Sequence, residues 1–273
     1  MKRAINLLLV LCMVLCLLAG CRSGITNASQ PGTPDTEKPV DLVVFAAASL
    51  TETLNQIAKD YKEVAPNITL VFNFDSSGTL KTQVEEGADC DLFLSAAPKQ
   101  MNELEELGLL VADSRIDLLE NKVALAVPDG NPAEITSYDD LKERLQAGNV
   151  LLVMGNSDVP VGQYTQKIFT YYGLDEAALA EKGCITYGSN VKEVTTQVSE
   201  AAADCGIIYA TDAASAGLAV VDTATQEMCG QVIYPAAVLN TTQNQDAARA
   251  FLSYLTGEAA GAVFASVGFT PLA

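Results

Sequence analysis

The chain has 273 residues, and 49% of them are hydrophobic, which indicates a globular protein and excludes a disordered one. The formal net charge is −18, with 34 acidic and 16 basic residues. This excess argues against nucleic acid and anionic lipid as partners, because both are bound through basic patches. The absence of His removes most general-base schemes and most metal sites.

The first twenty residues have the pattern of an export signal. Lys2 and Arg3 form a basic start, and small residues precede Cys21. The apolar run between them, about fifteen residues, is short for a membrane span, which needs ~20. Cys21 follows the small residues as the acylated cysteine does in bacterial lipoproteins, which this segment resembles. We therefore expect residues 1–20 to be a signal peptide and Cys21 to anchor the protein to the outer face of the cell membrane. An ordinary signal peptide or a short anchor are the alternatives.

Residues 22–39 are rich in Pro, Gly, Ser and Thr, which predicts a flexible linker. After it, apolar strands alternate with helical periodicity. Strands are expected at 42–45, 68–74, 91–94, 122–127, 150–154 and 206–209, with an extended stretch at 232–239 that Pro235 interrupts. Helices are expected within 50–61, 79–86, 99–107, 191–198, 247–255 and 259–266, with another ending at 172. This alternation indicates an α/β protein with mixed, mostly parallel sheets.

Two strand-to-helix turns are candidates for a binding site, because ligands of open α/β sheets bind beyond the carboxyl ends of the strands. In the first, three alanines lead to Ser49, and Glu52 three residues later completes a capping-box pattern, so Ser49 is expected to start a helix. The second turn, residues 75–79, is small and polar around Ser77. Serine caps helices without any ligand. Two such turns together, however, bring enough N–H groups and positive helix ends to hold an anion without a cationic side chain.

Segments around both turns carry a family resemblance. VFAAASLTETLNQIA, FDSSGTL and DLFLSAAPKQM resemble, in order and spacing, the periplasmic molybdate-binding proteins of ABC importers, and SDVPVGQYTQKIF, GSNVKEVTTQVSE, GIIYATDAAS and VGF continue the likeness. It covers about residues 41–269 and implies a periplasmic-binding-protein fold of two lobes with the ligand cleft between them. The lobes are placed at 40–121 with 236–273 and at 122–235. The expected ligand is molybdate or tungstate, delivered by a monomer to a membrane permease, without a cofactor or direct metal ligands.

The resemblance also implies the ligand contacts. They are the hydroxyl and N–H groups of Ser49 and Ser77, the N–H groups of Ala96, Val159 and Val191, and the hydroxyl of Tyr209. A dianion gains about 1.5–3 kcal/mol from each charge-assisted bond to such donors. Hydrogen phosphate would bring a proton that finds no acceptor, whereas sulfate must be excluded by size. Asn190 and Glu193 resemble another capping box, which would place Val191 just inside a helix.

The other charged residues near these turns, and the later cysteines, are not expected to bind the ligand. Asp75 is expected to face solvent, and Lys81 and Lys192 to lie solvated on the surface. Buried thiols and one or two disulfides are equally open for the four later cysteines, which are Cys90, Cys184, Cys205 and Cys229.

Three alternative functions remain open. The same fold could bind sulfate, phosphate or an organic solute, although the proposed turns contain no Arg to pair with a carboxylate. A non-transporting oxyanion sensor with a lipid anchor is the second. The third is an exported enzyme with Ser49 or Ser77 as nucleophile, which the absence of His and of a G-x-S-x-G motif disfavours.

Overall fold

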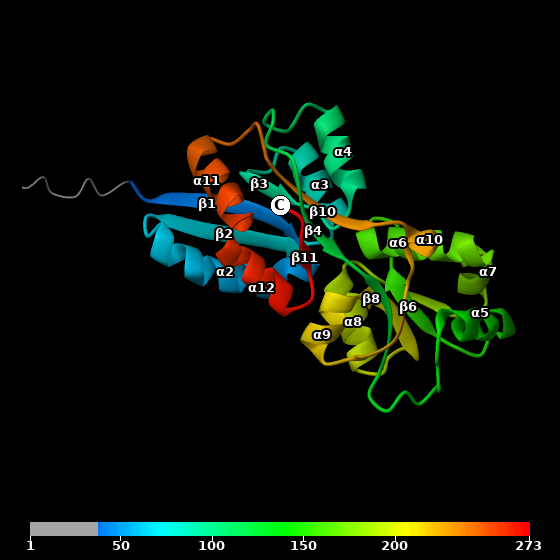
Figure 1. Ribbon diagram of the computed structural model, residues 1–273. Coiled ribbons are helices and arrows are strands. Elements are labelled where there is room, and N and C mark those ends of the chain that lie inside the picture. Colours follow the sequence, from blue (N-terminus) through cyan, green and yellow to red (C-terminus); the bar gives the residue numbers. More distant parts are fainter. Residues whose placement is uncertain (1–37) are drawn as a thin grey trace, which may run out of the picture. The chain divides into compact units, whose positions relative to one another are not determined.

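The computed structural model describes residues 38–273, so the predicted signal peptide, Cys21 and nearly all of the linker lie outside the described residues. The described chain forms two α/β lobes, each built on its own sheet (Figure 1). The two-lobe α/β fold expected from the sequence is therefore confirmed. Between residues 38 and 273, no helix is both long enough and apolar enough to cross a membrane.

The first lobe is built on a six-stranded sheet. Its strands, in spatial order, are β11 (Thr270–Pro271), β4 (Ile116–Asn121), β10 (Val232–Val238), β3 (Leu92–Leu94), β1 (Val40–Ala47) and β2 (Ile68–Asp75). β1 pairs in parallel with β2 and β3, whereas the pairings of β10 and β4 are antiparallel.

The second lobe is built on a five-stranded sheet. Its strands are β7 (Ile185–Gly188), β6 (Leu152–Gly155), β8 (Cys205–Tyr209), β5 (Val123–Val127) and β9 (Ala219–Thr223). β6 is parallel to β7 and β8, and β5 is antiparallel to β8 and β9. Both sheets are thus mixed, as expected, but they are not mostly parallel, because four strand pairings are parallel and five are antiparallel.

Helices connect the strands of both lobes and cover the sheets. Those of the first lobe are the 3₁₀ turn η1 (Ala48–Leu50), α2 (Thr51–Val64), α3 (Ser77–Glu85), α4 (Pro98–Glu106), α11 (Gln245–Leu255) and α12 (Glu258–Ser266). Those of the second lobe are α5 (Tyr138–Ala147), α6 (Pro160–Tyr172), α7 (Glu176–Glu181), α8 (Val191–Ser199), α9 (Ala210–Ala216) and α10 (Gln226–Cys229).

Helix α6 shows how local sequence sets these elements. Pro160 occupies its first position, where a missing N–H costs nothing, and Gly173 ends it in the left-handed conformation with φ of 66°. Tyr164, Ile168 and Phe169 are buried along one face. Burial of each such side chain contributes about 1.5–3 kcal/mol, so packing rather than propensity holds this helix against its sheet.

The chain crosses between the lobes at two places in the described residues. The first crossing lies between β4 and β5, which are separated by Lys122 alone, and the second lies between β9 and β10. Pro235 interrupts the pairing of β10 with β4 through a register shift next to Tyr234, because proline has no N–H to donate to the ladder. The lobe boundaries at 121/122 and 235/236 stay a prediction.

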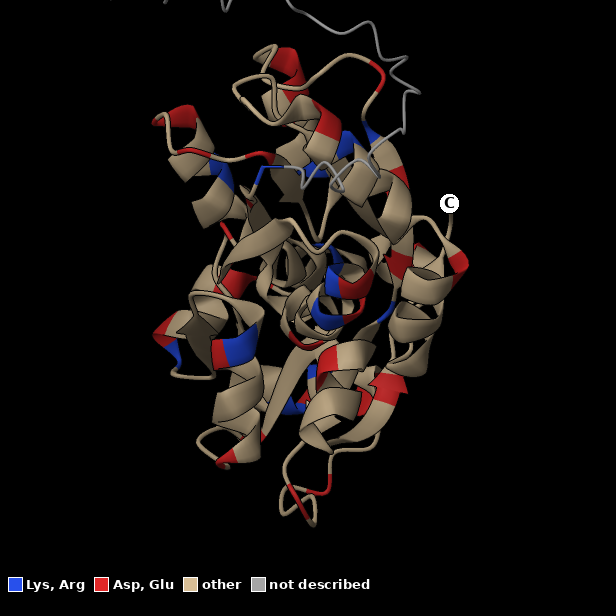
Figure 2. Cartoon of the chain, turned by 90° about the vertical axis from the view of Figure 1, so that its left-hand side faces the viewer, with Lys and Arg blue, Asp and Glu red and all other residues tan. Residues whose placement is uncertain are grey.

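The surface reflects the acidic composition. Asp and Glu are spread over the helices and loops of both lobes in the face shown in Figure 2, with fewer Lys and Arg among them. With 34 acidic and 16 basic residues, the net charge of the chain does not attract an anion from a distance. Capture of an anion would therefore depend on local donors.

Candidate functional site

The strand register brings the predicted turns of the first lobe together. Ala47 at the end of β1 lies opposite Asp75 at the end of β2, and Ala46 lies opposite Leu94 at the end of β3. The chain therefore leaves these parallel strands at one edge of the sheet. Ser49, Ser77 and Ala96 each follow a strand end by two residues, which places all three at that edge.

The same arrangement occurs in the second lobe. Gly155 ends β6 opposite Gly188 at the end of β7, and the neighbouring strand β8 ends at Tyr209. Val159 and Val191 then lie at the starts of α6 and α8. The carboxyl ends of the parallel strands of both lobes face one another.

All six residues predicted as ligand contacts line one small pocket between these strand ends. Its lining consists of Ala47, Ala48, Ser49, Asp75, Ser76, Ser77 and Ala96 from the first lobe and Val159, Pro160, Val161, Val191 and Tyr209 from the second. The pocket has a volume of about 10 Å³, far below the ~300–1,000 Å³ of sites for drug-sized molecules. It suits a small ligand.

Ser49 does not begin a helix as the capping pattern predicted. The turn η1 starts at Ala48, and α2 follows it at Thr51, with no side-chain cap on either element. The Ser49 hydroxyl instead lies 3.0 Å from the hydroxyl of Tyr234, in a buried contact. A tertiary partner has thus replaced the local cap and leaves Ser49 at the pocket wall.

In the second turn, one serine caps the helix and the next one presents its hydroxyl to the pocket. Ser76 is the N-cap of α3 and accepts a hydrogen bond from the N–H of Thr79 at 3.1 Å. Ser77 is the first residue of the helix, where its N–H has no intrahelical acceptor. Its hydroxyl accepts a hydrogen bond from the Ala96 N–H at 3.0 Å. Ser77 and Ala96 therefore form one unit in the pocket wall, and the Ser77 hydroxyl proton remains free to donate.

The second lobe contributes two helix starts. Val159 is the N-cap of α6, and its N–H donates to the carbonyl of Asn156 at 3.0 Å. Val191 is the first residue of α8, as expected, and Asn190 caps that helix by accepting from the N–H of Glu193 at 3.1 Å. The reciprocal half of the predicted capping box is absent there, because the Glu193 carboxylate accepts from the Ser189 N–H at 2.7 Å.

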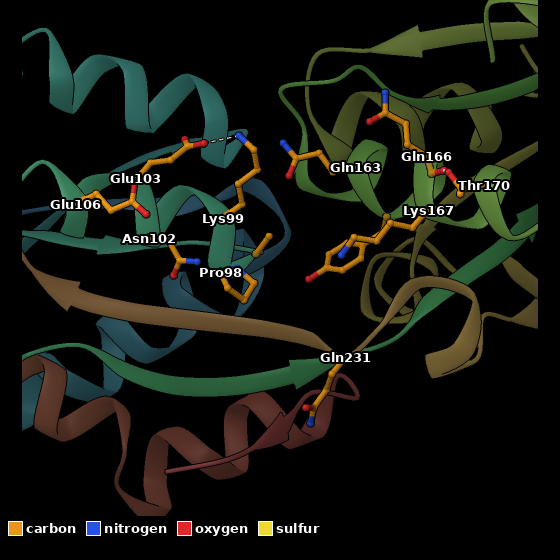
Figure 3. Close-up of a pocket in the computed structure, with 12 residues that line it drawn as sticks. Pro98, Lys99, Asn102, Glu103, Glu106, Gln163, Gln166, Lys167, Thr170 and Gln231 are labelled. Atoms are coloured by element: carbon orange, nitrogen blue, oxygen red, sulfur yellow. Dashed lines mark hydrogen bonds and ion pairs between the residues drawn. The ribbon is translucent and has the colours of Figure 1, made fainter. Parts of the chain in front are cut away.

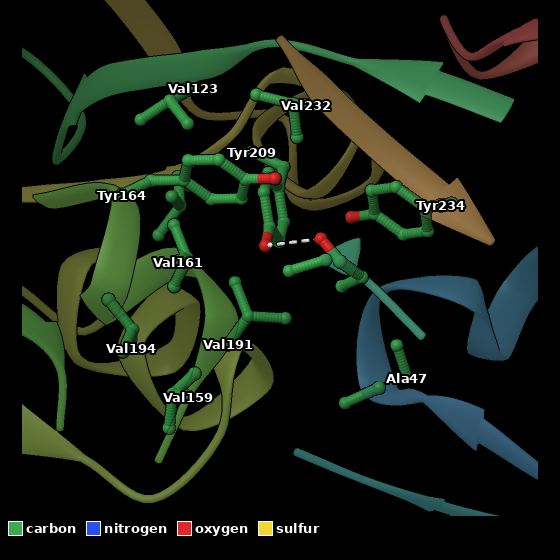
Figure 4. Close-up of a cluster of buried hydrophobic side chains, with 14 of the residues drawn as sticks. Ala47, Val123, Val159, Val161, Tyr164, Val191, Val194, Tyr209, Val232 and Tyr234 are labelled. Atoms are coloured by element: carbon green, nitrogen blue, oxygen red, sulfur yellow. Dashed lines mark hydrogen bonds between the residues drawn. The ribbon is translucent and has the colours of Figure 1, made fainter. Parts of the chain in front are cut away.

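Tyr209 closes the pocket from the second lobe. Its side chain is buried beside Tyr164 and Tyr234, with Val159 and Val191 on the same side of the cluster (Figure 4). The hydroxyl donates across the lobes to the Ala96 carbonyl at 3.5 Å. Burial raises the pKa of Tyr209 well above its ordinary value, with added repulsion from neighbouring groups. Tyr209 therefore stays protonated at neutral pH, and its one proton can pass from the long contact with the Ala96 carbonyl to a ligand.

The electrostatics of the pocket come from helix ends rather than from cationic side chains. None of the lining residues is Lys or Arg. The N-termini of α3, α6 and α8 reach the wall at Ser77, Pro160 and Val191, and each presents unpaired N–H groups with about half a positive charge. Such an arrangement binds small anions.

Asp75 does not face away into solvent as expected. It is half-buried in the pocket wall, and its Oδ1 accepts from the Ser76 N–H at 2.7 Å and from Asn190 Nδ2 at 3.3 Å. These two donors hold the carboxylate at the junction of the lobes, so Asp75 links the cleft walls.

Lys192 also departs from the sequence expectation, because it bridges the lobes instead of lying solvated. Its Nζ is 2.7 Å from Glu52 of the first lobe and 3.0 Å from the buried Asp212 of the second. Burial lowers the pKa of Lys192, but the two carboxylates raise it more, so the lysine stays charged. Lys81 pairs with Glu85 and Glu103 on the helices of the first lobe.

The described part of the chain shows neither a cluster of metal-ligating residues nor a disulfide. Within the described part of the chain, no group of three or more Asp, Glu, Cys or His residues could hold a metal ion. The four cysteines of this part are buried free thiols, which decides between the two open possibilities.

A larger groove lies elsewhere between the lobes. It has a volume of about 730 Å³ and runs between α4 and α6, with Lys99, Gln163 and Lys167 on its walls (Figure 3). Lys99 is paired with Glu103 at 2.5 Å. None of the predicted ligand residues lines this groove, so the small pocket is the better candidate site.

Sequence reasoning missed the residues behind the pocket. Tyr234, Asn121 and Asp212 are each buried and lie close to the site. No local motif marks them, since Tyr234 is 185 positions from Ser49. Asn121 and Tyr234 could have been noticed, because they are polar or aromatic residues of β4 and β10, the strands that adjoin the crossings between the lobes.

The comparisons agree with this geometry. A model of the family described as bacterial extracellular solute-binding protein matches residues 42–270. YvgL of Bacillus subtilis (strain 168), named as an ABC transporter substrate-binding lipoprotein, is 32% identical over 256 residues, covering 93% of each chain. Molybdate-binding protein ModA of Haemophilus influenzae is 36% identical over 233 residues, 84% of this chain and 89% of its own.

Solved structures give the same fold. A substrate-binding domain assigned to a molybdenum ABC transporter of Clostridium difficile is 32% identical with a TM-score of 0.63, covering 85% of this chain and 99% of its own. The periplasmic molybdate-binding protein of Azotobacter vinelandii is 21% identical with a TM-score of 0.73, covering 84% and 98%.

More distant likenesses include other functions. The sulfate-binding protein SubI of Mycobacterium tuberculosis is 17% identical with a TM-score of 0.71, covering 85% of this chain and 87% of its own. An aconitate isomerase of Pseudomonas is 24% identical and covers 90% of each chain. The matched family model and the relatives above 30% identity decide the family: this chain belongs to the bacterial extracellular solute-binding proteins, among the homologues of the molybdate-binding proteins.

Proposed function

We propose that this protein is an extracytoplasmic receptor for molybdate, and for tungstate, which it delivers as a monomer to an ABC permease in the membrane. One observation supports this most strongly: the six predicted donor residues from both lobes line one small pocket without any Lys or Arg. The names of the molybdate-binding relatives support the choice of ligand.

The pocket chemistry favours a fully deprotonated tetrahedral anion. The serine hydroxyls, the Tyr209 hydroxyl and the N–H groups at helix starts are all donors. Each bond from such a donor to an anion contributes about 1.5–3 kcal/mol. A ligand proton would find no acceptor among these groups, at a cost of about 1–3 kcal/mol. The one carboxylate in the lining, that of Asp75, is already held by the Ser76 N–H and Asn190 Nδ2. Molybdate and tungstate satisfy this requirement equally.

Because the donors come from two lobes, binding of the ligand would be coupled to closure of the lobes. Neither lobe supplies all of them, so the ligand gains its full set of bonds only when the lobes close on it by a hinge motion. The crossings beside Lys122 and before Val232 are the places for this hinge. A closed complex would then be the form that the permease recognises.

Calorimetric titration of residues 22–273 tests the proposal. Tight molybdate and tungstate binding is expected, with sulfate weaker because it is smaller and phosphate weaker because it is protonated. Absence of molybdate binding by a protein shown to be folded would refute the proposal. Preference for sulfate would favour the function of the SubI-like relatives, whose likeness to this chain is in the fold alone.

Removing either serine hydroxyl should weaken binding without unfolding the protein. Ser49→Ala and Ser77→Ala are each expected to lower molybdate affinity by about 1–3 kcal/mol, roughly 5- to 150-fold, because each removes one charge-assisted bond. Ser253→Ala, on the exposed face of α11, is the matched control. Titration of the three variants, with melting curves, checks the prediction. An affinity equal to that of the wild type would exclude the residue from the site.

The proposed location rests on Cys21, outside the described residues. Cys21→Ala is expected to release the protein from the membrane fraction into the medium or periplasm, because the acylated thiol would be its only anchor. Fractionation with labelled fatty acid measures this, and Cys90→Ala, a buried thiol, is the control. Membrane retention of the Cys21 variant with continued labelling contradicts the anchor.

The remaining alternatives differ in partners rather than in the site. We propose that the protein is not an enzyme, since the Ser49 and Ser77 hydroxyls contact Tyr234 and the Ala96 N–H instead of a base. A sensor lipoprotein would bind the same anions but would leave molybdate uptake unchanged when its gene is deleted, whereas a transport receptor would lower uptake.

A further inference from the structure

A buried hydrogen-bond chain runs behind the pocket. The hydroxyl of Tyr234 on β10 lies 3.0 Å from Ser49 Oγ and 3.2 Å from Asn121 Nδ2. Asn121, the last residue of β4, also donates to Thr211 Oγ1 of the second lobe at 2.9 Å. Tyr234 and Asn121 belong to the strands that adjoin the two crossings between the lobes. The chain thus connects these strands with a predicted ligand residue.

The orientation of Asn121 fixes the direction of the first bond. Its amide oxygen accepts from the Lys122 N–H at 2.8 Å, so its nitrogen must face Tyr234. An amide nitrogen donates and does not accept. The Tyr234 oxygen therefore accepts from Asn121, and the Tyr234 proton needs a different partner.

We assign Ser49 as that partner, a choice of direction in a contact where either hydroxyl can donate. Burial raises the pKa of Tyr234 well above its ordinary value, so its hydroxyl keeps its proton. Ser49 Oγ lies 3.0 Å away and can accept it. A serine hydroxyl has one proton; once Ser49 accepts from Tyr234, that proton can point into the pocket.

Ser77, the second serine of the pocket, also accepts a hydrogen bond and keeps its own proton free, but the donor is a different group. Ser77 Oγ accepts from the Ala96 N–H at 3.0 Å, and an N–H group cannot accept in return. Both serines therefore receive a hydrogen bond from behind and have their own proton left for the pocket. The two bonds come from different elements, β10 for Ser49 and the segment after β3 for Ser77.

We propose that Tyr234 is a positioning residue that holds Ser49 as a hydrogen-bond donor toward the pocket, and that it thereby favours fully deprotonated oxyanions over protonated ones. This inference rests on the proposed oxyanion-binding function. The donors Asn121, Tyr234 and Ser49 point in one direction, and such aligned chains strengthen one another in a buried site. Without the Tyr234 proton, Ser49 could turn and accept a proton from a ligand such as hydrogen phosphate.

Tyr234→Phe tests the proposal because it removes only the hydroxyl. The ring keeps its edge-to-face contacts with Tyr209 at 5.6 Å and Phe269 at 5.3 Å. Molybdate affinity is expected to fall roughly three- to tenfold, whereas phosphate affinity measured by competition does not fall. The preference for molybdate over phosphate therefore narrows by the same factor. A general distortion of the pocket would weaken both anions alike and would overturn the proposal.

Tyr164→Phe is the matched control. Tyr164 belongs to the same buried cluster, with its ring 6.4 Å from that of Tyr209, and it does not line the small pocket. Its variant should bind both anions as the wild type does. An equal loss of molybdate preference in Tyr164→Phe would show that any lost hydroxyl in the cluster has this effect, against a specific role for Tyr234.

A double-mutant cycle identifies the residue through which Tyr234 acts. In a Ser49→Ala background, Tyr234→Phe should change molybdate affinity no further, because the chain of bonds ends at Ser49. An undiminished effect there, or an effect that disappears only in a Tyr209→Phe background, overturns the proposal. Titration of the wild type separates a failure of the proposed function from a failure of this inference. If the folded wild type does not bind molybdate, the proposed function is wrong. If the wild type binds molybdate and Tyr234→Phe binds both anions with the same affinities, only this inference is wrong.

Discussion

Gly78→Ala is expected to lower molybdate affinity by more than about 100-fold, because it removes two charge-assisted bonds worth about 3 kcal/mol or more together. Gly78 is the second residue of α3, and a Cβ built on it would lie 2.2 Å from the carbonyl oxygen of Asp158 in the second lobe. Neither group is a flexible side-chain end, so the lobes must move apart. The donors at Val191 and Tyr209 then no longer reach a ligand held by the first lobe. Calorimetric titration measures the loss.

The same substitution elsewhere provides the control. Gly261 lies within α12, and a Cβ there would have only an ordinary contact, 3.7 Å from Pro271. Gly261→Ala should bind molybdate normally. Because alanine favours helices over glycine, Gly78→Ala should fold as well as the wild type, and small-angle scattering should show it failing to compact on adding molybdate. Wild-type affinity in a folded Gly78→Ala protein would show that close approach of the lobes is not needed.

Asp212→Asn is expected to remove a pH dependence of stability. Burial raises the pKa of Asp212 from 3.8 to about 6, although Lys192 opposes the shift. The folded state therefore holds this proton more tightly than the unfolded state, and the resulting stability is present below pH 3.8 and lost as the pH rises through 6. The full difference of about two pKa units corresponds to about 3 kcal/mol. Asparagine does not titrate and loses nothing over this range.

Chemical unfolding of both proteins from pH 4 to 7.5 measures the effect. The unfolding free energy of Asp212→Asn relative to the wild type should rise by about 2–3 kcal/mol across this range. Asp117→Asn, at an exposed position of β4, removes the same charge from the surface and controls for net charge. If the unfolding free energies of the wild type and Asp212→Asn changed with pH in the same way, Asp212 would not hold a proton in the folded state.

Much of the fold could be predicted because its signals are local. Leu54, Ile57 and Tyr61 fall on one face of α2 and are buried there, and Gly173 ends α6 in the left-handed conformation that favours glycine. By contrast, β4 was missed. Its sequence, IDLLEN, has no pattern that distinguishes a strand from a helix, and its partner β10 lies more than a hundred residues away. Pairing over that distance decides its structure.

In the site, too, local features could be predicted and contacts between distant residues could not. The six predicted contact residues share one pocket, because each lies at a strand end or shortly after one and the register aligns those ends. The predictions that failed concern charged and capping side chains. Ser49 bonds to Tyr234 instead of capping a helix, and Lys192 bonds to Glu52 across 140 positions instead of facing solvent. Local pattern alone cannot reveal partners supplied by tertiary structure.

A crystal structure of residues 22–273 with molybdate, measured at the molybdenum absorption edge, tests the proposed site most directly. One strong anomalous peak is expected between the lobes, with oxygens within hydrogen-bond distance of Ser49, Ser77, Val191 and Tyr209. A peak in the groove between α4 and α6, or one held mainly by Lys or Arg side chains, would contradict the proposed site.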